Sequence, residues 1–348
     1  MIPRGLPLRI RVVFAFVSVV LFVALSEAVV RVARMDTYFQ NRFFILNRAL
    51  DYPEVFKKDR VLFWRLREGQ TATSEFFEGR TYRINSLGLR GDEVGPTNAA
   101  RRVLTLGNSC TFGWGVPYQS TFSARLEENL GGAYEVINAG IPGYSSFQGR
   151  RFFERELVHL KPDVVVIMFG WNDHWAAASG IPDKEQRFPP EMVLKFHNEL
   201  SRLHSYRLLK KLLLSLLEKD PDSLFDRAAP VYRVGFDDFR ANLHAICETV
   251  QRTGAIPILV TSPAPALPAD NRDVWWAPAV RYHARYNEVV RELARSARVV
   301  LVDAGRASEQ REGLYDDAFL DFIHFNASGH ELVATLLTRA IVTVDDSR

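Results

Sequence analysis

The sequence predicts an α/β protein built on a parallel sheet of five strands with helices on both faces. From residue 103 onward, short apolar runs rich in Val, Ile and Leu recur without alternation, as in strands buried on both faces. Helical stretches separate these runs, which is typical of parallel sheets. The first hundred residues differ, with one long apolar run and short β-like segments. We therefore expect a domain at 101–345, preceded by a membrane segment at 1–35 and a small β-rich segment at 36–100.

The N-terminal segment is long and apolar enough to cross a membrane. Residues 12–25 carry no charge, and the apolar character continues to Val30 with Glu27 as the one acid. A bilayer span takes about 20 mostly apolar residues, and a soluble core helix would normally have a polar face. A single-pass, uncleaved membrane anchor is the expectation.

Cleavage is the alternative, because Ser26 and Ala28 resemble the small residues at a signal-peptide cleavage site. Arg9 and Arg11 precede the apolar run, which favours an N-terminus inside the cell. The body is then expected to be periplasmic or extracellular.

The small β-rich segment at 36–100 contains short stretches broken by Gly and Asn, such as 61–66 and 81–85. The expected strands of the main sheet are 103–106, 134–138, 164–169, 256–261 and 299–302. The expected helices are 121–130, 146–160, 237–252, 282–296 and one beginning near Ser328.

A helical insertion at 176–233 separates the third strand of the main sheet from the fourth. Its leucine-rich stretch at 208–217 is apolar around much of its circumference. Packing inside the domain is the simplest explanation, and a lid or a membrane-facing helix is the alternative.

The amino-acid composition bears on which partners and cofactors are expected. The chain has 44 basic and 41 acidic residues and a net charge of +3, which does not indicate a nucleic-acid partner. Its two cysteines, Cys110 and Cys247, form neither a disulfide framework nor a metal site. No cofactor or metal is expected, and nothing in the composition indicates an oligomeric state.

The turn after the first strand of the main sheet holds a candidate nucleophile. Ser109 lies between Gly107 and Gly113, where a strand meets a helix. Acyl transfer needs an exposed hydroxyl at such a turn, with backbone N–H groups near the developing oxyanion. A helix-capping serine is the alternative. Cys110 is a rival nucleophile, but neighbouring residues after a strand usually point in different directions.

Candidate oxyanion donors follow the next two strands. Gly140 ends the second strand and Asn172 follows the third. In an open α/β sheet, the carboxyl ends of the strands form the ligand crevice. The N–H groups of Ser109 and Gly140 and the amide of Asn172 would then meet at one oxyanion hole. Taken singly, Gly140 is an ordinary strand end and Asn172 an ordinary turn residue.

A candidate base lies near the C-terminus. His324 can accept a serine proton near neutral pH. Asp321, three residues earlier, can hydrogen-bond the other ring nitrogen and fix its tautomer. The alternative is a loop histidine that caps the final helix.

Together these blocks resemble the SGNH (GDSL) hydrolase superfamily. The matching positions are the turn at Ser109, the glycine at 140, the block at 170–173 and the block at 321–324. Order and approximate spacing agree over residues 102–340. The resemblance implies a flavodoxin-like three-layer α/β/α fold and ester hydrolysis or acyl transfer. Asn108 departs from the family pattern, where an acid precedes the serine.

Residues 83–91 resemble a segment that precedes the catalytic domain in some bacterial membrane-anchored members of the superfamily. We therefore expect a serine ester hydrolase at a membrane or cell surface, either carboxylesterase- or lipase-like or a deacetylase. Its substrate would be a small-molecule, glycan or lipid ester. An O-acyltransferase that modifies a cell-surface glycan is one alternative, and a catalytically idle membrane-anchored binding or assembly module is another.

Overall fold

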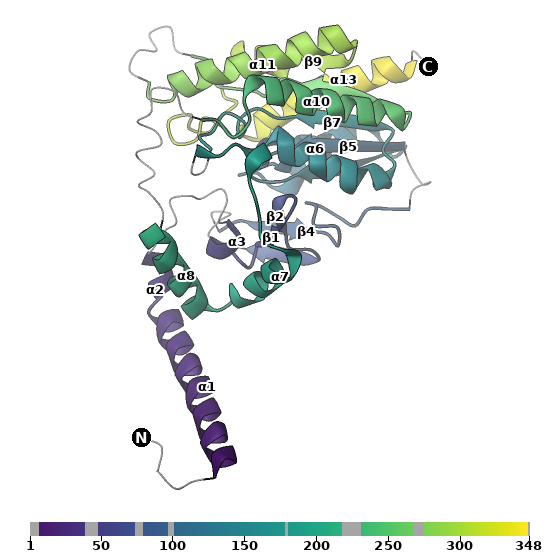
Figure 1. Cartoon of the computed structure of the whole chain (residues 1–348). Helices are drawn as coiled ribbons and strands as arrows, with labels where there is room; N and C mark the ends of the chain where they lie inside the picture. Colours follow the sequence, from purple (N-terminus) through teal and green to yellow (C-terminus); the bar gives the residue numbers. More distant parts are fainter. Residues whose placement is uncertain are drawn as a thin grey trace.

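The computed structural model describes residues 7–38, 48–73, 79–96, 101–177, 180–217, 231–267 and 274–346. One long helix, α1 (Leu8–Val32), projects away from the sheet-containing body (Figure 1). Within the described ranges, α1 is the one helix whose length and apolar composition suit a membrane span. The short helices α2 (Met35–Tyr38) and α3 (Arg48–Asp51) follow it.

The body is built on a five-stranded sheet in the order β6-β5-β7-β8-β9, with every neighbouring pair parallel. The strands are β5 (Arg101–Gly107), β6 (Tyr134–Gly140), β7 (Val164–Met168), β8 (Ile256–Val260) and β9 (Val300–Val302). Each contains or overlaps one of the predicted apolar runs. The predicted fold class is therefore confirmed.

Helices cover both faces of this sheet. Buried side chains of α6 and α10 pack on one face, those of α5 and α13 pack on the other, and α11 contributes to both clusters. The helices and 3-10 turns of the body are α4 (Ser109–Phe112), η2 (Tyr118–Ser120), α5 (Phe122–Leu130), α6 (Ser146–Arg155), η3 (Leu157–Leu160), α10 (Phe236–Arg252), α11 (Ala277–Ala297), α12 (Ala304–Glu309) and α13 (Ala327–Asp346).

Two helical predictions differ in detail. The predicted helix at 146–160 is divided, because Glu156 leaves the helical conformation with φ −133° and a 3-10 turn follows. The helix α11 begins at Ala277, five residues before the expected start, with a proline in its first turn. Proline is compatible with that position, because the first N–H groups of a helix have no intrahelical partner.

The N-terminal segment forms two small antiparallel sheets, β1 (Phe56–Asp59) with β2 (Phe63–Leu66) and β3 (Gln70–Thr73) with β4 (Thr81–Ile84). Its apolar side chains belong to the same buried cluster as those of the large sheet. Trp64 ties the two together, because its Nε1 donates to Pro142 O at 3.2 Å and its carbonyl accepts from Tyr144 Oη at 2.7 Å. The proposed boundary near residue 100 thus separates two segments that share one core.

The described part of the 176–233 insertion contains η5 (Asp183–Glu185), α7 (Glu191–Leu200) and α8 (His204–Leu217), while 178–179 and 218–230 lie outside the described residues. An antiparallel bridge between Ala176 and Tyr232 joins its two ends. Arg233 and Asp183 form a buried ion pair at 2.8 Å beneath that bridge. The base of the insertion is therefore fixed to the body.

Candidate active site

The nucleophile candidate lies at the start of a short helix. Strand β5 ends at Gly107, and α4 begins at Ser109. Asn108 caps α4, because its Oδ1 accepts from the backbone N–H of Cys110 at 2.9 Å. The amide that replaces the family's usual acid thus keeps an acceptor where the turn needs one.

Two glycines allow this turn to pack closely on the neighbouring strands. A Cβ on Gly107 would lie 2.0 Å from Thr111 Oγ1 and 2.6 Å from Met168 O. A Cβ on Gly140 would lie 2.1 Å from the backbone nitrogen of Phe112. All three distances are far inside van der Waals contact, so any other residue at either position would push α4 away from the sheet and shift Ser109 with it.

The structure brings the predicted serine, histidine and aspartate together in one hydrogen-bonded chain. His324 Nε2 lies 2.8 Å from Ser109 Oγ, and His324 Nδ1 lies 2.7 Å from Asp321 Oδ2. The other oxygen of Asp321 accepts the backbone N–H groups of Ile323 and His324, each at 3.0 Å. Four successive residues therefore supply both the carboxylate and the groups that hold it in place.

The environment keeps Asp321 ionised. Burial acts to raise the pKa of Asp321, but its hydrogen bond to His324, the charge of that ring and the two backbone N–H groups hold the pKa below its ordinary value. An ionised Asp321 favours a proton on Nδ1 of His324. The lone pair of Nε2 then faces the Ser109 hydroxyl and can accept its proton.

The predicted oxyanion donors differ in how they are engaged. The Asn172 side chain is buried, and its Nδ2 donates to Tyr144 O at 3.1 Å. An amide nitrogen has two N–H groups, so this bond orients the side chain and leaves a second donor. The N–H of Gly140 donates to Asn138 Oδ1 at 3.0 Å. Gly140 would have to share that bond to bind an oxyanion, whereas its missing Cβ already serves the packing of α4.

Asp173 organises the loop that carries Asn172. Its Oδ1 accepts from Ser146 N at 2.8 Å and its Oδ2 from Gly170 N at 3.1 Å, which ties this loop to the start of α6. Burial raises the pKa of Asp173 to about 7, although the hydrogen bonds from Ser146 oppose the change. The sequence contained this residue in the 170–173 block, but its position alone did not indicate a bracing role.

Arg90 also acts on the turn that carries Ser109, a role that could be predicted only indirectly from the sequence. Its Nη1 donates to the carbonyls of Phe112 and Gly113 at 2.7 and 2.6 Å, and its Nη2 donates to Val116 O at 2.7 Å. The guanidinium lies 4.3 Å from the ring centroid of Tyr82, in a cation–π geometry. Arg90 thus connects the N-terminal segment to the end of α4. The available signal was its place in the 83–91 segment.

Cys110 is not a member of the hydrogen-bonded chain of Ser109, His324 and Asp321. Its thiol is buried and donates to Ile323 O at 3.5 Å. Burial, together with the negative charge of Asp321, raises the pKa of the Cys110 thiol. A thiol of this kind stays protonated and is a poor nucleophile.

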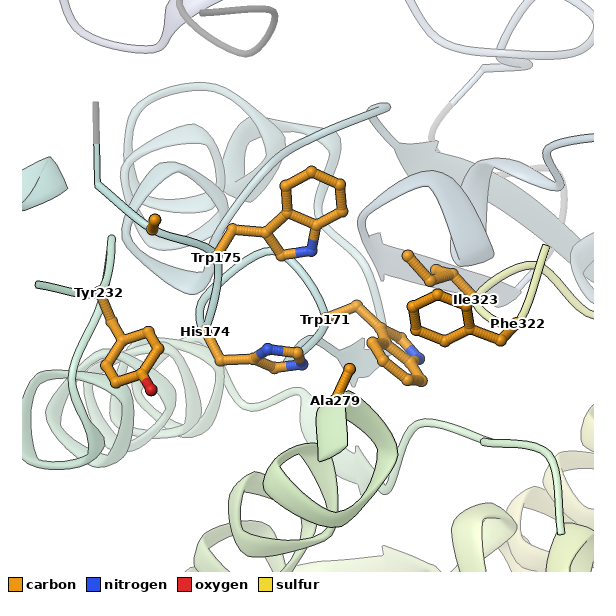
Figure 2. A pocket seen from close by; sticks show the side chains of 8 residues that line it. Trp171, His174, Trp175, Tyr232, Ala279, Phe322 and Ile323 are labelled. Atoms are coloured by element: carbon orange, nitrogen blue, oxygen red, sulfur yellow. The ribbon is translucent and has the colours of Figure 1, made fainter. Parts of the chain in front are cut away.

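An apolar pocket of about 280 Å³ lies beside the candidate site, lined in part by residues that adjoin Asn172 and His324 in the chain (Figure 2). Phe322 and Ile323 of its wall separate Asp321 from His324 in the chain, and Trp171 directly precedes Asn172. Burial lowers the pKa of His174 to about 4, so its ring is neutral at physiological pH. The lining residues are Trp171, His174, Trp175, Ala176, Tyr232, Ala279, Phe322 and Ile323.

Within the described part of the chain, no group of three or more His, Cys, Asp and Glu side chains is placed to hold a metal ion. The candidate site itself contains a serine, a histidine, an aspartate and nearby amide groups.

Comparison with known proteins gives one curated relative and several solved structures. An uncharacterized lipoprotein of Bacillus subtilis is 29% identical over 122 residues, which are 33% of this chain and 49% of that protein. The match thus spans about half the length of that relative.

Three solved structures are similar at low identity. An acetylxylan esterase from Geobacillus stearothermophilus is 19% identical with a TM-score of 0.46, covering 70% of this chain and 94% of its own. A GDSL-like lipase from Bacteroides thetaiotaomicron is 18% identical with a TM-score of 0.44, covering 72% and 93%. A lipase/acylhydrolase from Enterococcus faecalis is 20% identical with a TM-score of 0.43, covering 69% and 95%.

A family model decides the assignment. The model of the GDSL-like Lipase/Acylhydrolase family matches residues 105–332. This range is well over half of the 348 residues and includes Ser109, Asn172, Asp321 and His324. The chain therefore belongs to the GDSL-like lipase/acylhydrolase family of ester-bond hydrolases.

Proposed function

We propose that this protein hydrolyses carboxylic esters through an acyl-enzyme on Ser109, with His324 as general base and Asp321 as the group that orients it. The observation that carries the proposal is the pair of contacts at His324, 2.8 Å to Ser109 Oγ and 2.7 Å to Asp321 Oδ2. Both are within the range in which proton transfer can occur.

The proposed reaction has two steps. His324 takes the proton of Ser109 as the hydroxyl oxygen attacks the ester carbonyl, and the tetrahedral oxyanion accepts hydrogen bonds from Ser109 N–H and the Asn172 amide. Gly140 N–H would join them by sharing its bond to Asn138. His324 then protonates the leaving alcohol as the C–O bond breaks. Water, activated by the same histidine, attacks the acyl-enzyme and releases the acid.

The apolar pocket in Figure 2 is suited to an ester that carries an apolar group of limited size. Its volume of about 280 Å³ is slightly below the range of small-molecule sites, about 300 to 1,000 Å³. The aromatic side chains of Trp171 and Phe322 offer flat apolar surface to such a group. We propose that it binds a short or medium acyl chain, or the apolar part of the alcohol.

Kinetics with p-nitrophenyl esters of graded acyl length test the assignment. Ser109→Ala and His324→Ala should each lose turnover by several orders of magnitude. Cys110→Ala should keep most of it, because that thiol is buried and bonds to Ile323 O, whereas His324 bonds to Ser109. Turnover retained in purified, folded Ser109→Ala protein would refute the nucleophile assignment.

We further propose that α1 is kept as a membrane anchor, with the catalytic body on the outer side of the membrane. The support is the contact between α1 and α8. Glu27 accepts from His204 N at 3.0 Å, Ser205 N at 2.9 Å and Ser205 Oγ at 2.8 Å, so it caps the start of α8. Cleavage after Ala28 would remove that cap.

Mass measurement of the protein extracted from membranes tests retention of α1. We expect the mass of a chain that includes Glu27, and a chain that begins beyond Ala28 would contradict it. Protease treatment of spheroplasts, whose inner membrane is intact, tests the orientation, because a body on the outer side of that membrane should be digested.

A further inference from the structure

We propose that α7 of the insertion lies in the headgroup region of the same membrane and seats the catalytic body on lipid. This inference rests on the proposed anchoring by α1. It starts from the face of α7 that packs on the body. Leu194 and His197 are buried, and Asn198 exchanges two hydrogen bonds with the backbone of Lys58, at 2.7 and 3.0 Å. One side of α7 is therefore fixed to β1.

A second face of α7 is apolar and exposed. Met192, Val193, Phe196 and Leu200 are 71%, 52%, 64% and 41% exposed. Their spacing of one, four and eight residues from the first places them along one side of a helix. Four large exposed apolar side chains on a helix of ten residues form a continuous stripe, which favours an apolar environment over water.

A third face of α7 is charged. Glu191 and Lys195 form an ion pair at 3.2 Å with both side chains about three-quarters exposed, and Glu199 follows on the same side. The helix thus has separate sides for protein, for an apolar medium and for water. That division is expected of a helix lying at a membrane surface beside a folded body.

The position of α7 identifies the apolar medium. Leu200 ends α7, and His204 begins α8 with its backbone bound to Glu27. Glu27 lies five residues before the end of α1 at Val32. Figure 1 shows α7 at the foot of the body near this end of α1, with its axis running across that of α1. A helix that crosses the direction of a membrane span at the end of that span lies along the membrane surface.

The charged residues near the end of α1 and in the link between α7 and α8 also favour a lipid surface. Arg31 binds Glu27 at 3.1 Å, and Arg202 lies in the short link between α7 and α8, with its side chain 60% exposed. Arginines at this level can reach lipid phosphates, and anionic lipid would strengthen the contact. The occupant that we infer for the α7 stripe is therefore a lipid surface with anionic headgroups.

Spin labelling of the full chain tests the inference. Cys110 and Cys247 are buried, so a nitroxide label attaches selectively to an introduced cysteine. We would compare Phe196→Cys on the apolar stripe with Glu199→Cys on the charged side of the same helix. Both proteins would be reconstituted in vesicles of phosphatidylcholine and phosphatidylglycerol. Collision with oxygen, which concentrates in lipid, would be measured against collision with a water-soluble nickel chelate.

We expect the ratio of the collision rate with oxygen to that with nickel to be several-fold higher at position 196 than at position 199. Both proteins should retain ester hydrolysis, which shows that they are folded. A water-like ratio at 196, or a label shielded from both reagents as by a protein partner, would overturn the inference. A label at Val20→Cys reports on α1 separately. If position 20 also has a water-like ratio, the anchoring proposal fails and this inference fails with it. If position 20 reports lipid, the anchor stands whatever happens at 196.

Discussion

Replacing Arg90 by methionine tests how the N-terminal segment supports catalysis. Methionine keeps an apolar stem but removes the three hydrogen bonds to the carbonyls of Phe112, Gly113 and Val116. Those carbonyls lie at the end of α4, the helix that begins with Ser109, and in the turn that follows it. Arg90 touches none of the reacting atoms, so we regard it as a positioning residue.

The expected magnitude follows from two opposing effects. Burial lowers the pKa of Arg90 to about 10 from its ordinary value of 12.5, so keeping the guanidinium charged inside the fold costs about 3 kcal/mol. Hydrogen bonds from a charged donor contribute about 1.5 to 3 kcal/mol each, and three of them outweigh that cost. Losing both effects should reduce the free energy of unfolding by about 1.5 to 6 kcal/mol.

Two assays distinguish a loss of positioning at the site from a general loss of stability. Urea unfolding measures the stability, and ester kinetics measure whether kcat falls while KM changes little. We expect kcat to fall by about 100-fold, because a shift of about 1 Å in a reacting group is enough for such a loss. Arg90→Lys should recover part of it, since one charged donor remains.

Arg83→Met provides the matched control. Arg83 lies in the same N-terminal segment, but its ion pair with Asp92 is solvent-exposed, with side chains 63% and 76% exposed. Such pairs contribute about 0 to 1 kcal/mol. Equal effects of Arg83→Met and Arg90→Met on stability and kcat would refute the positioning role.

Three further predictions address the site and its support. Asn172→Ala should lower kcat by about 100- to 1,000-fold with the fold retained, because one oxyanion donor is lost; an unchanged kcat would show that its amide does not face the reacting oxygen. Arg233→Met leaves the buried Asp183 without its ion-pair partner, although Ser145 Oγ still donates to it. It should reduce the free energy of unfolding measured in urea by about 3 to 5 kcal/mol, whereas Lys184→Met, at an exposed residue, should alter it by less than about 1 kcal/mol. Asp173 is more readily protonated in the folded chain, with a pKa raised to about 7, so the stability it contributes below about pH 4 is lost as the pH rises toward 7; Asp173→Asn should flatten the melting temperature over this window, and identical pH profiles would contradict the assignment.

The sheet and the reacting groups could be predicted because their signals are local. Each strand is a short run of Val, Ile and Leu, and each reacting group follows a strand end or precedes a helix. Asp321 and His324 are three residues apart, so their contact needed no knowledge of the tertiary fold. The position of Ser109 could be predicted because it directly follows the first strand of the main sheet.

Other features depend on contacts between distant segments. Arg90 donates to carbonyls more than twenty residues ahead of it in the chain. The leucine-rich helix α8 has the least predictable arrangement. Of its described side chains, the buried ones are Arg207 and Lys211, which pair with Asp36 and Asp51. Four of its leucines are exposed: Leu209, Leu212, Leu213 and Leu216. Periodicity locates the two faces but does not reveal that acids of the N-terminal segment cover the basic one.

Mass spectrometry of a fluorophosphonate adduct tests the central claim most directly. We predict that the full chain is modified on the peptide that contains Ser109, that ester hydrolysis is lost in proportion to labelling, and that His324→Ala reacts far more slowly. Rapid hydrolysis by protein with no adduct on Ser109, or an adduct on another residue that accounts for the loss of activity, would contradict the claim.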